Sequence, residues 1–226
     1  EGFAGEAMAS GERMPLAALD APASGRMAVG EALTNLLAAP VELERVKLSC
    51  NWMAACGEPG EDAALYDTVR AVAMQLCPAL GVGVPVGKDS LSMRTTWTDE
   101  SGQARKVVAP VSLVVTAFAT LADVRGTLTP ALHGGGSVLV LVDLGGGRDR
   151  LGGSILAHVL GRFGGTVPDL DEPTRLTALY AAMADLRARG LVTAYHDRSD
   201  GGLWAALCEM SFAGRVGLQI GLPAGT

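Results

Sequence analysis

Apolar residues recur at helical spacing in two early stretches of the chain. Residues 22–38 place five apolar side chains on one helical face: Met27, Val29, Leu33, Leu36 and Leu37. We expect Ser24 to cap the start of this helix, and Pro40 follows its end. Residues 61–80 carry the clearest stripe, formed by Leu65, Val69, Val72 and Leu76. Both stretches are therefore predicted to be helices with one buried face.

Shorter apolar runs, bounded by polar or glycine-rich stretches, predict strands. They cover residues 44–52, 107–120, 137–147, the start of 191–203, and 216–222. Residues 81–97 are expected to form a strand that a glycine–lysine turn at Gly87–Lys88 interrupts, followed by a polar hairpin at Asp99–Lys106. Residues 1–19 are expected to be a loop that leads into a short strand or turn. Further helices are predicted over 154–164, 173–189 and 203–214.

The composition of the chain changes at residues 125–136, where a polar, proline-containing linker ends in a run of glycines. We place a boundary here and expect two units, residues 1–128 and 129–226. The mixture of helices and strands predicts the α/β (α+β) class. Because the sequence lacks an initiator methionine and a new strand has just begun where it stops, we expect a piece of a longer protein.

Charge and composition exclude several classes of protein. The net charge is −6 and no basic stripe is present, so we expect no nucleic-acid partner. No apolar run approaches the roughly 20 residues of a membrane helix, so we expect no membrane partner. The four cysteines form no C-x-x-C pair or zinc-type cluster, which is typical of a reduced, cytoplasmic protein. Glycine is frequent, at 30 of 226 residues, and suits tight loops around a ligand.

Glu31 and Asn35 are the first candidate ligand pair. They are four residues apart on the first predicted helix, so both side chains leave one face about 5–6 Å apart. A carboxylate and an amide oxygen are hard ligands that suit Mg²⁺. An ordinary exposed pair is the alternative, although the small neighbours Gly30, Ala32 and Thr34 leave room for a ligand.

The stretch HDRSDGGL, residues 196–203, is the second candidate, at a predicted strand-to-helix turn. Asp197 and Asp200 offer oxygens for a metal or for capping, Ser199 offers a hydroxyl, and the two following glycines offer free N–H groups. Helix N-termini favour phosphate. The alternative is a capped turn in which Asp200 is the N-cap. His196 could be a catalytic base, or a strand-end histidine that makes one backbone hydrogen bond.

Two further stretches are weaker signals. Lys88, in the stretch PVGKDSLSM, could contact phosphate together with Ser90 and Ser92, but the spacing is not that of a P-loop. The glycine-rich residues 144–154 could wrap a nucleotide or form a flexible turn, and Arg148 and Arg150 are expected to be solvated. No Ser/His/Asp or Cys/His triad can be assembled, so no catalytic residue is assigned, and Cys56 is interpreted as a structural thiol.

Five motifs in order resemble one family: GEAMASGERMP (5–15), VGEALTN (29–35), KLSCNWMAACGEPGEDAALYD (47–67), PVGKDSLSM (85–93) and HDRSDGGL (196–203). The chain resembles the large, single-chain form of phosphoribosylformylglycinamidine synthase, an enzyme of purine synthesis. The resemblance implies an aminoimidazole ribonucleotide synthetase-like fold, with the later part of an N-terminal half followed by the first part of a C-terminal half. It also implies partnership with the other domains of that chain, including a glutaminase domain.

The resemblance also implies site residues and a reaction. It places Mg²⁺ ligands at Glu31, Asn35 and Asp197 and a nucleotide contact at Ser199. It also places Lys88 in a motif close to the nucleotide site. The implied reaction converts formylglycinamide ribonucleotide, ATP, glutamine and water into the amidine, ADP, phosphate and glutamate. Whether this nucleotide site turns over or is an auxiliary, structural site stays open. The alternatives are a non-catalytic scaffold segment, or another ATP-dependent kinase of the same superfamily, such as one of thiamine-phosphate or selenophosphate synthesis.

Overall fold

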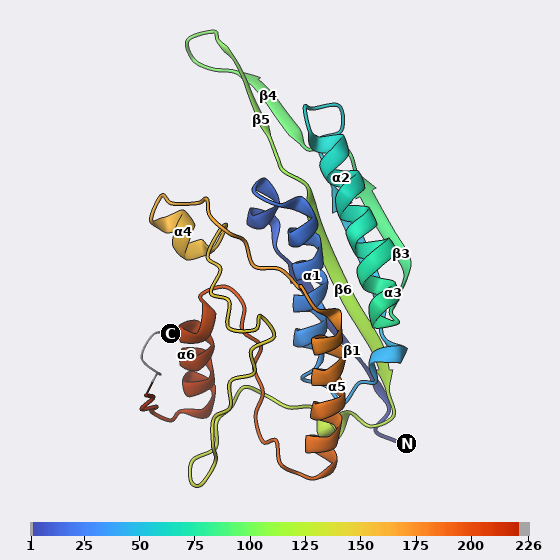
Figure 1. Ribbon diagram of the computed structural model, residues 1–226, viewed down its shortest axis with the longest axis vertical. Helices are drawn as coiled ribbons and strands as arrows, with labels where there is room; N and C mark the ends of the chain where they lie inside the picture. The colour runs from blue at the N-terminus through green and yellow to red at the C-terminus, as the bar shows by residue number, and fades with distance from the viewer. Residues whose placement is uncertain (1, 222–226) are drawn as a thin grey trace.

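A four-stranded sheet with helices on one face forms the centre of the structure (Figure 1). The structure is a computed structural model that describes residues 2–221. Its strands lie in the order β1 (Gly5–Glu12), β6 (Ser112–Leu121), β2 (Lys47–Met53) and β3 (Gly83–Ser90). The pairs β1–β6 and β6–β2 are antiparallel, whereas β2 and β3 are parallel. Parallel neighbours need a crossover connection, and a long helix supplies it.

Two long helices cover this sheet. Helix α1 (Ala21–Leu36) follows the short 3-10 helix η1 (Met14–Ala18), and the crossover helix runs continuously through α2 (Glu61–Val69), the π-helical segment η3 (Arg70–Leu76) and α3 (Cys77–Leu80). Apolar side chains of both helices join those of β2 and β6 in one buried core. Both predicted helices are therefore confirmed. The predicted cap is wrong, because the Asp20 side chain, and not Ser24, accepts the N–H of Ala23 at the start of α1.

The polar hairpin predicted at 99–106 is confirmed. Strands β4 (Arg94–Thr98) and β5 (Ala104–Val108) pair antiparallel and extend away from the rest of the molecule (Figure 1). Asp99 closes the turn by accepting hydrogen bonds from the Ser101 hydroxyl, the Gln103 N–H and the Arg105 guanidinium, which together lower the pKa of Asp99 to about 2. The long strand predicted at 107–120 is divided, since β5 ends before β6 begins.

The turn predicted at Gly87–Lys88 is wrong. Strand β3 continues through both residues, and Cys50 of β2 is the register partner of Gly87. A Cβ atom on Gly87 would lie 2.4 Å from the Cys50 carbonyl oxygen. Glycine is therefore present because the two strands approach closely at this point. Residues 1–19 also hold more structure than predicted, since β1 alone spans eight residues.

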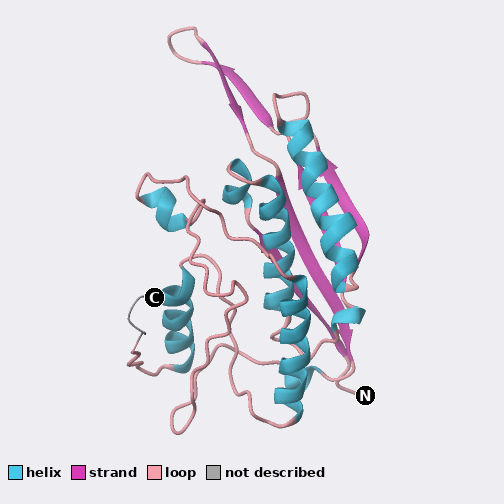
Figure 2. Cartoon of the chain, viewed as in Figure 1, coloured by secondary structure: helices cyan, strands magenta, loops and turns pink. Residues whose placement is uncertain are grey.

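The later part of the described chain is built from helices and long loops (Figure 2). It contains α4 (Ile155–Val159), α5 (Pro173–Ala188) and α6 (Gly202–Gly214). The helices predicted at 173–189 and 203–214 are confirmed, and the one predicted at 154–164 is shorter. The strands predicted at 137–147, at the start of 191–203 and at 216–222 are wrong as far as residue 221, because these segments belong to no sheet among the described residues; residue 222 lies outside the described part. Two short 3-10 helices, η2 (Leu43–Arg45) and η4 (Val124–Gly126), complete the elements.

Helix α5 joins the later part of the chain to the earlier part. It lies against α1 (Figure 1), and its residues Leu176, Tyr180 and Met183 belong to the same buried core as α1 and the sheet. The α/β class predicted from the sequence is confirmed. None of the helices in residues 2–221 combines the length and apolar character that a membrane span requires.

Candidate functional site

Glu31 lies on α1 where this helix meets the end of β1. Its carboxylate accepts the backbone N–H of Glu12 at 2.8 Å and lies 3.4 Å from a guanidinium nitrogen of Arg13. Gly11 permits this contact, because a Cβ atom there would lie 2.2 Å from the Ala28 carbonyl oxygen and 2.3 Å from the Ala32 nitrogen. The missing side chain at Gly11 therefore lets β1 approach α1 and fixes the Glu31 carboxylate.

Asn35 lies one turn after Glu31 and also contacts β1. Its side-chain N–H₂ donates to the carbonyl oxygen of Ser10 at 3.1 Å. Because the nitrogen is the donor, the amide oxygen accepts no hydrogen bond from residues 2–221 and could contact a cation. The two residues thus use neighbouring backbone groups of one strand, as the four-residue spacing predicts.

Residues 195–202, which we call the acidic turn, carry the second set of candidate site residues, after Glu31 and Asn35 on α1. The His196 ring is fixed on both sides: Nδ1 lies 2.6 Å from the Asp197 carbonyl oxygen, and Nε2 lies 2.8 Å from a carboxylate oxygen of Glu209 on α6. The Asp197 side chain is only 10% exposed. The Ser199 hydroxyl accepts the N–H of Asp200 at 2.6 Å. This arrangement gives His196 a role in holding the turn.

Arg13 connects the two sets. Its guanidinium donates to the Asp200 carboxylate at 2.7 Å and lies against Glu31 on the other side. The backbone of Arg13 is fixed because its carbonyl oxygen accepts the hydroxyl of Ser24 at 2.6 Å. Sequence reasoning did not select Arg13, although its position beside Glu12 in the GERMP stretch was visible.

A cavity of about 1560 Å³ lies between the two parts of the chain and receives these groups. Glu31, Arg13, Asp197, Ser199 and Asp200 all contribute to its lining. Residues 2–221 contain no group of three acidic, histidine or cysteine side chains arranged to hold a metal ion. A cation held by Glu31 and Asp197 would therefore need further oxygens, from an amide and from its own ligand, and this donor set suits Mg²⁺ bound to a polyphosphate.

The other predicted residues are placed differently. Asn35 is not among the lining residues, although it lies one turn from Glu31 on the same helix. Lys88 lies on the exposed strand β3, and its amino group donates to the Ser90 hydroxyl at 2.6 Å. Lys88 does not line the cavity. Glu31, Asp197 and Ser199 therefore line one large cavity, and Lys88 lies outside its lining.

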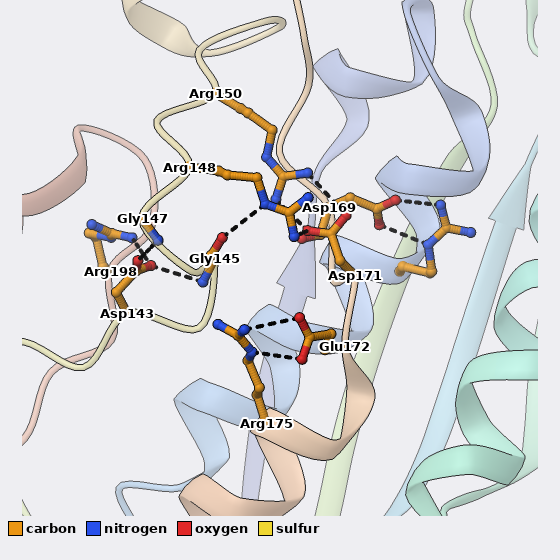
Figure 3. Close-up of polar contacts among 11 residues, drawn as sticks. Asp143, Gly145, Gly147, Arg148, Arg150, Asp169, Asp171, Glu172, Arg175 and Arg198 are labelled. Atoms are coloured by element: carbon orange, nitrogen blue, oxygen red, sulfur yellow. Dashed lines mark hydrogen bonds and ion pairs between the residues drawn. The ribbon is translucent and has the colours of Figure 1, made fainter.

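A loop of glycines and charged residues also contributes to the lining of the cavity, through Asp143, Gly145 and Arg148 among others, and Figure 3 shows the polar contacts of this loop. Asp143 accepts the N–H groups of Gly147 at 2.5 Å and Gly145 at 2.9 Å, and these bonds lower its pKa, helped by Arg198 and Arg175. The loop is therefore a closed turn held by one carboxylate.

The arginines beside this loop form ion pairs (Figure 3). Arg150 lies 2.7 Å and Arg148 3.1 Å from the same oxygen of Asp171, and the hydrogen bond from Arg150 lowers the pKa of Asp171. The expectation that Arg150 is solvated is wrong, because its side chain is only 12% exposed. Nearby, Arg26 of α1 makes two hydrogen bonds to Asp169, at 2.8 and 2.6 Å, which raise the pKa of Arg26.

Two family models match the chain. The model described as the FGAR-AT PurM_N-like domain matches residues 1–120. The model described as the C-terminal domain of AIR synthase related protein matches residues 134–224.

Solved structures share the fold at low sequence identity. *Thermotoga maritima* PurL complexed with FGAR matches at a TM-score of 0.59 and 16% identity, over 94% of this chain and 32% of that one. PurLQS from the same organism matches at 0.60 and 14%, over 94% and 30%. Thiamine-monophosphate kinase from *Stenotrophomonas maltophilia* K279a matches at 0.50 and 18%, over 94% and 62%. The chain thus spans about a third of the length of the PurL structures.

Proposed function

Because this chain belongs to the family of FGAR-AT PurM_N-like domains, we propose that it is part of the synthetase region of a formylglycinamide ribonucleotide amidotransferase and binds a Mg²⁺–nucleotide there. The whole amidotransferase, of which this chain would be a part, is an ATP-dependent carbon–nitrogen ligase of purine synthesis that uses glutamine as the amide donor. Its partners are ATP or ADP, formylglycinamide ribonucleotide and a glutaminase domain, and it works in the cytoplasm.

One observation carries the proposal: Glu31 from α1 and Asp197 from the acidic turn line the same cavity. These two segments are far apart in the sequence and belong to regions that different family models match. Mg²⁺ would be held by Glu31 and Asp197, with Asn35, which lies one turn from Glu31 and outside the cavity lining, as the third predicted ligand, and would neutralise the charge of the nucleotide phosphates. The nucleotide would contact Ser199, close to the start of α6, where an anion is favoured. The Gly202 N–H already donates to the Ser199 carbonyl oxygen at 3.0 Å, so it holds the turn.

The position of Lys88 makes it a weaker candidate for nucleotide binding than the residues that line the cavity. Its amino group is engaged with Ser90 on a strand outside the cavity, so Lys88 would reach a nucleotide only by leaving that bond. We therefore assign nucleotide binding to the residues of α1 and the acidic turn first. The kinase match shares the fold alone, and the FGAR-AT model over residues 1–120 favours the amidotransferase.

The test is nucleotide binding by the full-length protein with Glu31→Gln or Asp197→Asn. Loss of a charged ligand is expected to weaken Mg²⁺-dependent ADP binding by about tenfold or more, measured by titration calorimetry. Glu42→Gln is the matched control, because within residues 2–221 Glu42 forms an exposed ion pair with Arg45 alone. Unchanged binding in both site variants would support the scaffold alternative. If binding is lost while glutamine-dependent turnover persists, the site is auxiliary and structural.

A further inference from the structure

The C-terminal end of α1 has carbonyl groups that its own helix cannot satisfy. The last four carbonyls of any α-helix lack the usual intrahelical partner. The backbone N–H of Ala38 bonds to the Asn35 oxygen at 3.2 Å, so it does not serve as the usual helical donor to Thr34. The hydroxyl of Tyr195 instead donates to the Thr34 oxygen at 2.8 Å. A side chain from the later part of the chain therefore completes α1.

The two ends of this hydrogen bond lie beside the proposed ligands. Thr34 lies between Glu31 and Asn35 on α1, and Tyr195 precedes Asp197 by two residues. Among the described residues, this is the only hydrogen bond recorded directly between residues 31–35 and residues 195–197.

The rest of the acidic turn is fixed from other sides. The backbone N–H of Tyr195 bonds to the Thr129 oxygen at 3.0 Å, and the His196 ring holds the Asp197 carbonyl and Glu209. These two contacts do not involve α1. Arg13 links Glu31 to Asp200 through its guanidinium, whereas the Tyr195 phenol bonds directly to the backbone of α1, two residues before Asp197.

We propose that Tyr195 is a positioning residue of the Mg²⁺–nucleotide site, and that its hydroxyl holds Asp197 in register with Glu31 and Asn35. The inference rests on the proposed function, since it assigns the geometry of that same site. Tyr195 contacts neither ion nor nucleotide in this role and acts only through Asp197. The expected consequence of losing the hydroxyl is weaker Mg²⁺-dependent binding, with binding of the Mg²⁺-free nucleotide little changed.

The chain supplies a matched control in Tyr180. Its hydroxyl donates to the Leu33 oxygen of the same helix at 2.7 Å, one residue away from the Tyr195 contact. Tyr180 lies on α5, however, and is not part of the acidic turn. Tyr180→Phe thus removes the same kind of hydrogen bond from the same end of α1 without releasing Asp197.

The experiment measures ADP affinity of the full-length protein with Mg²⁺ and with a chelator, together with the urea midpoint. Tyr195→Phe is expected to lower the Mg²⁺-dependent affinity by about three- to tenfold, the size of one net hydrogen bond. Tyr180→Phe is expected to retain the original affinity while showing a comparable loss of stability. Equal loss of affinity in both variants, or no loss in Tyr195→Phe, overturns the inference.

The Glu31→Gln variant separates this inference from the proposed function. If Glu31→Gln abolishes Mg²⁺-dependent binding and Tyr195→Phe leaves it intact, the site exists and the positioning role is wrong. If Glu31→Gln also binds normally, the cavity does not hold the ion through this residue, and the positioning role is overturned with it.

Discussion

Two regions of the chain with similar apolar content reach different structures. In β6, alternate side chains are buried against α1 and the crossover helix, and they are Leu113, Val115, Ala117 and Ala119. In residues 138–142 all five apolar side chains are exposed, and Val138 is 84% exposed. Strand β6 has a neighbour on each side, whereas no described residue pairs with 138–142. An apolar run therefore becomes a strand only where its partner strands are also present.

The two regions are expected to differ most in the loss of unfolding free energy when one leucine of each is replaced by alanine. Leu113→Ala in β6 is expected to lower the free energy of unfolding by about 2–5 kcal/mol, because the side chain is buried and leaves a cavity. Leu141→Ala is expected to change it by no more than about 0.5 kcal/mol, because that side chain is mostly exposed. Urea unfolding of both variants measures the two values. Comparable losses would show that residues 138–142 are packed in solution.

A glycine-to-alanine pair sharpens the same comparison. Gly11→Ala in β1 is expected to cost about 1–3 kcal/mol or more, because the new methyl group would meet the backbone of α1, which cannot move aside cheaply. Gly164→Ala, in the later part, meets no atom within 4 Å and is expected to be within about 0.5 kcal/mol of the original chain.

Gly11→Ala has a second consequence, because β1 carries the Glu12 N–H that the Glu31 carboxylate accepts. The variant is expected to weaken Mg²⁺-dependent nucleotide binding as well as stability. Urea unfolding gives the first readout and titration calorimetry the second. A stable Gly11→Ala variant would mean that β1 does not approach α1 as closely as described.

The sequence was sufficient where structure depends on neighbouring residues. The apolar stripe of 61–80 predicted a helix that is observed over the same residues, and the four-residue spacing of Glu31 and Asn35 predicted their common face. Both results follow from helical geometry alone. The turn predicted at Gly87 is wrong for the opposite reason. The glycine is needed because Cys50 of another strand approaches closely, and this approach is not visible in the sequence.

The site was predictable in its acidic groups and not in the contacts that hold them. Glu31 and Asp197 were selected as oxygen donors, and the structure places both at one cavity. Arg13 and Tyr195 were not selected, because an arginine between two carboxylates and a phenol on a helix end are defined only by the packing of the two regions. Their roles at a nucleotide site remain predictions.

The contact between the two regions is also expected to change how the free energy of unfolding depends on pH in alkaline solution. Burial raises the pKa of Tyr180 and of Tyr195, whose hydroxyls donate to α1. The folded state therefore favours the protonated phenols, whereas unfolded tyrosine ionises at about pH 10. Their contribution to stability is complete below that pH and declines as the pH rises through the folded-state values. Tyr180→Phe and Tyr195→Phe should each make the fall of unfolding free energy above about pH 10 less steep, measured by urea unfolding at several pH values. A fall of unchanged slope in both variants would mean that the phenols are solvated, and that the later region does not pack on α1.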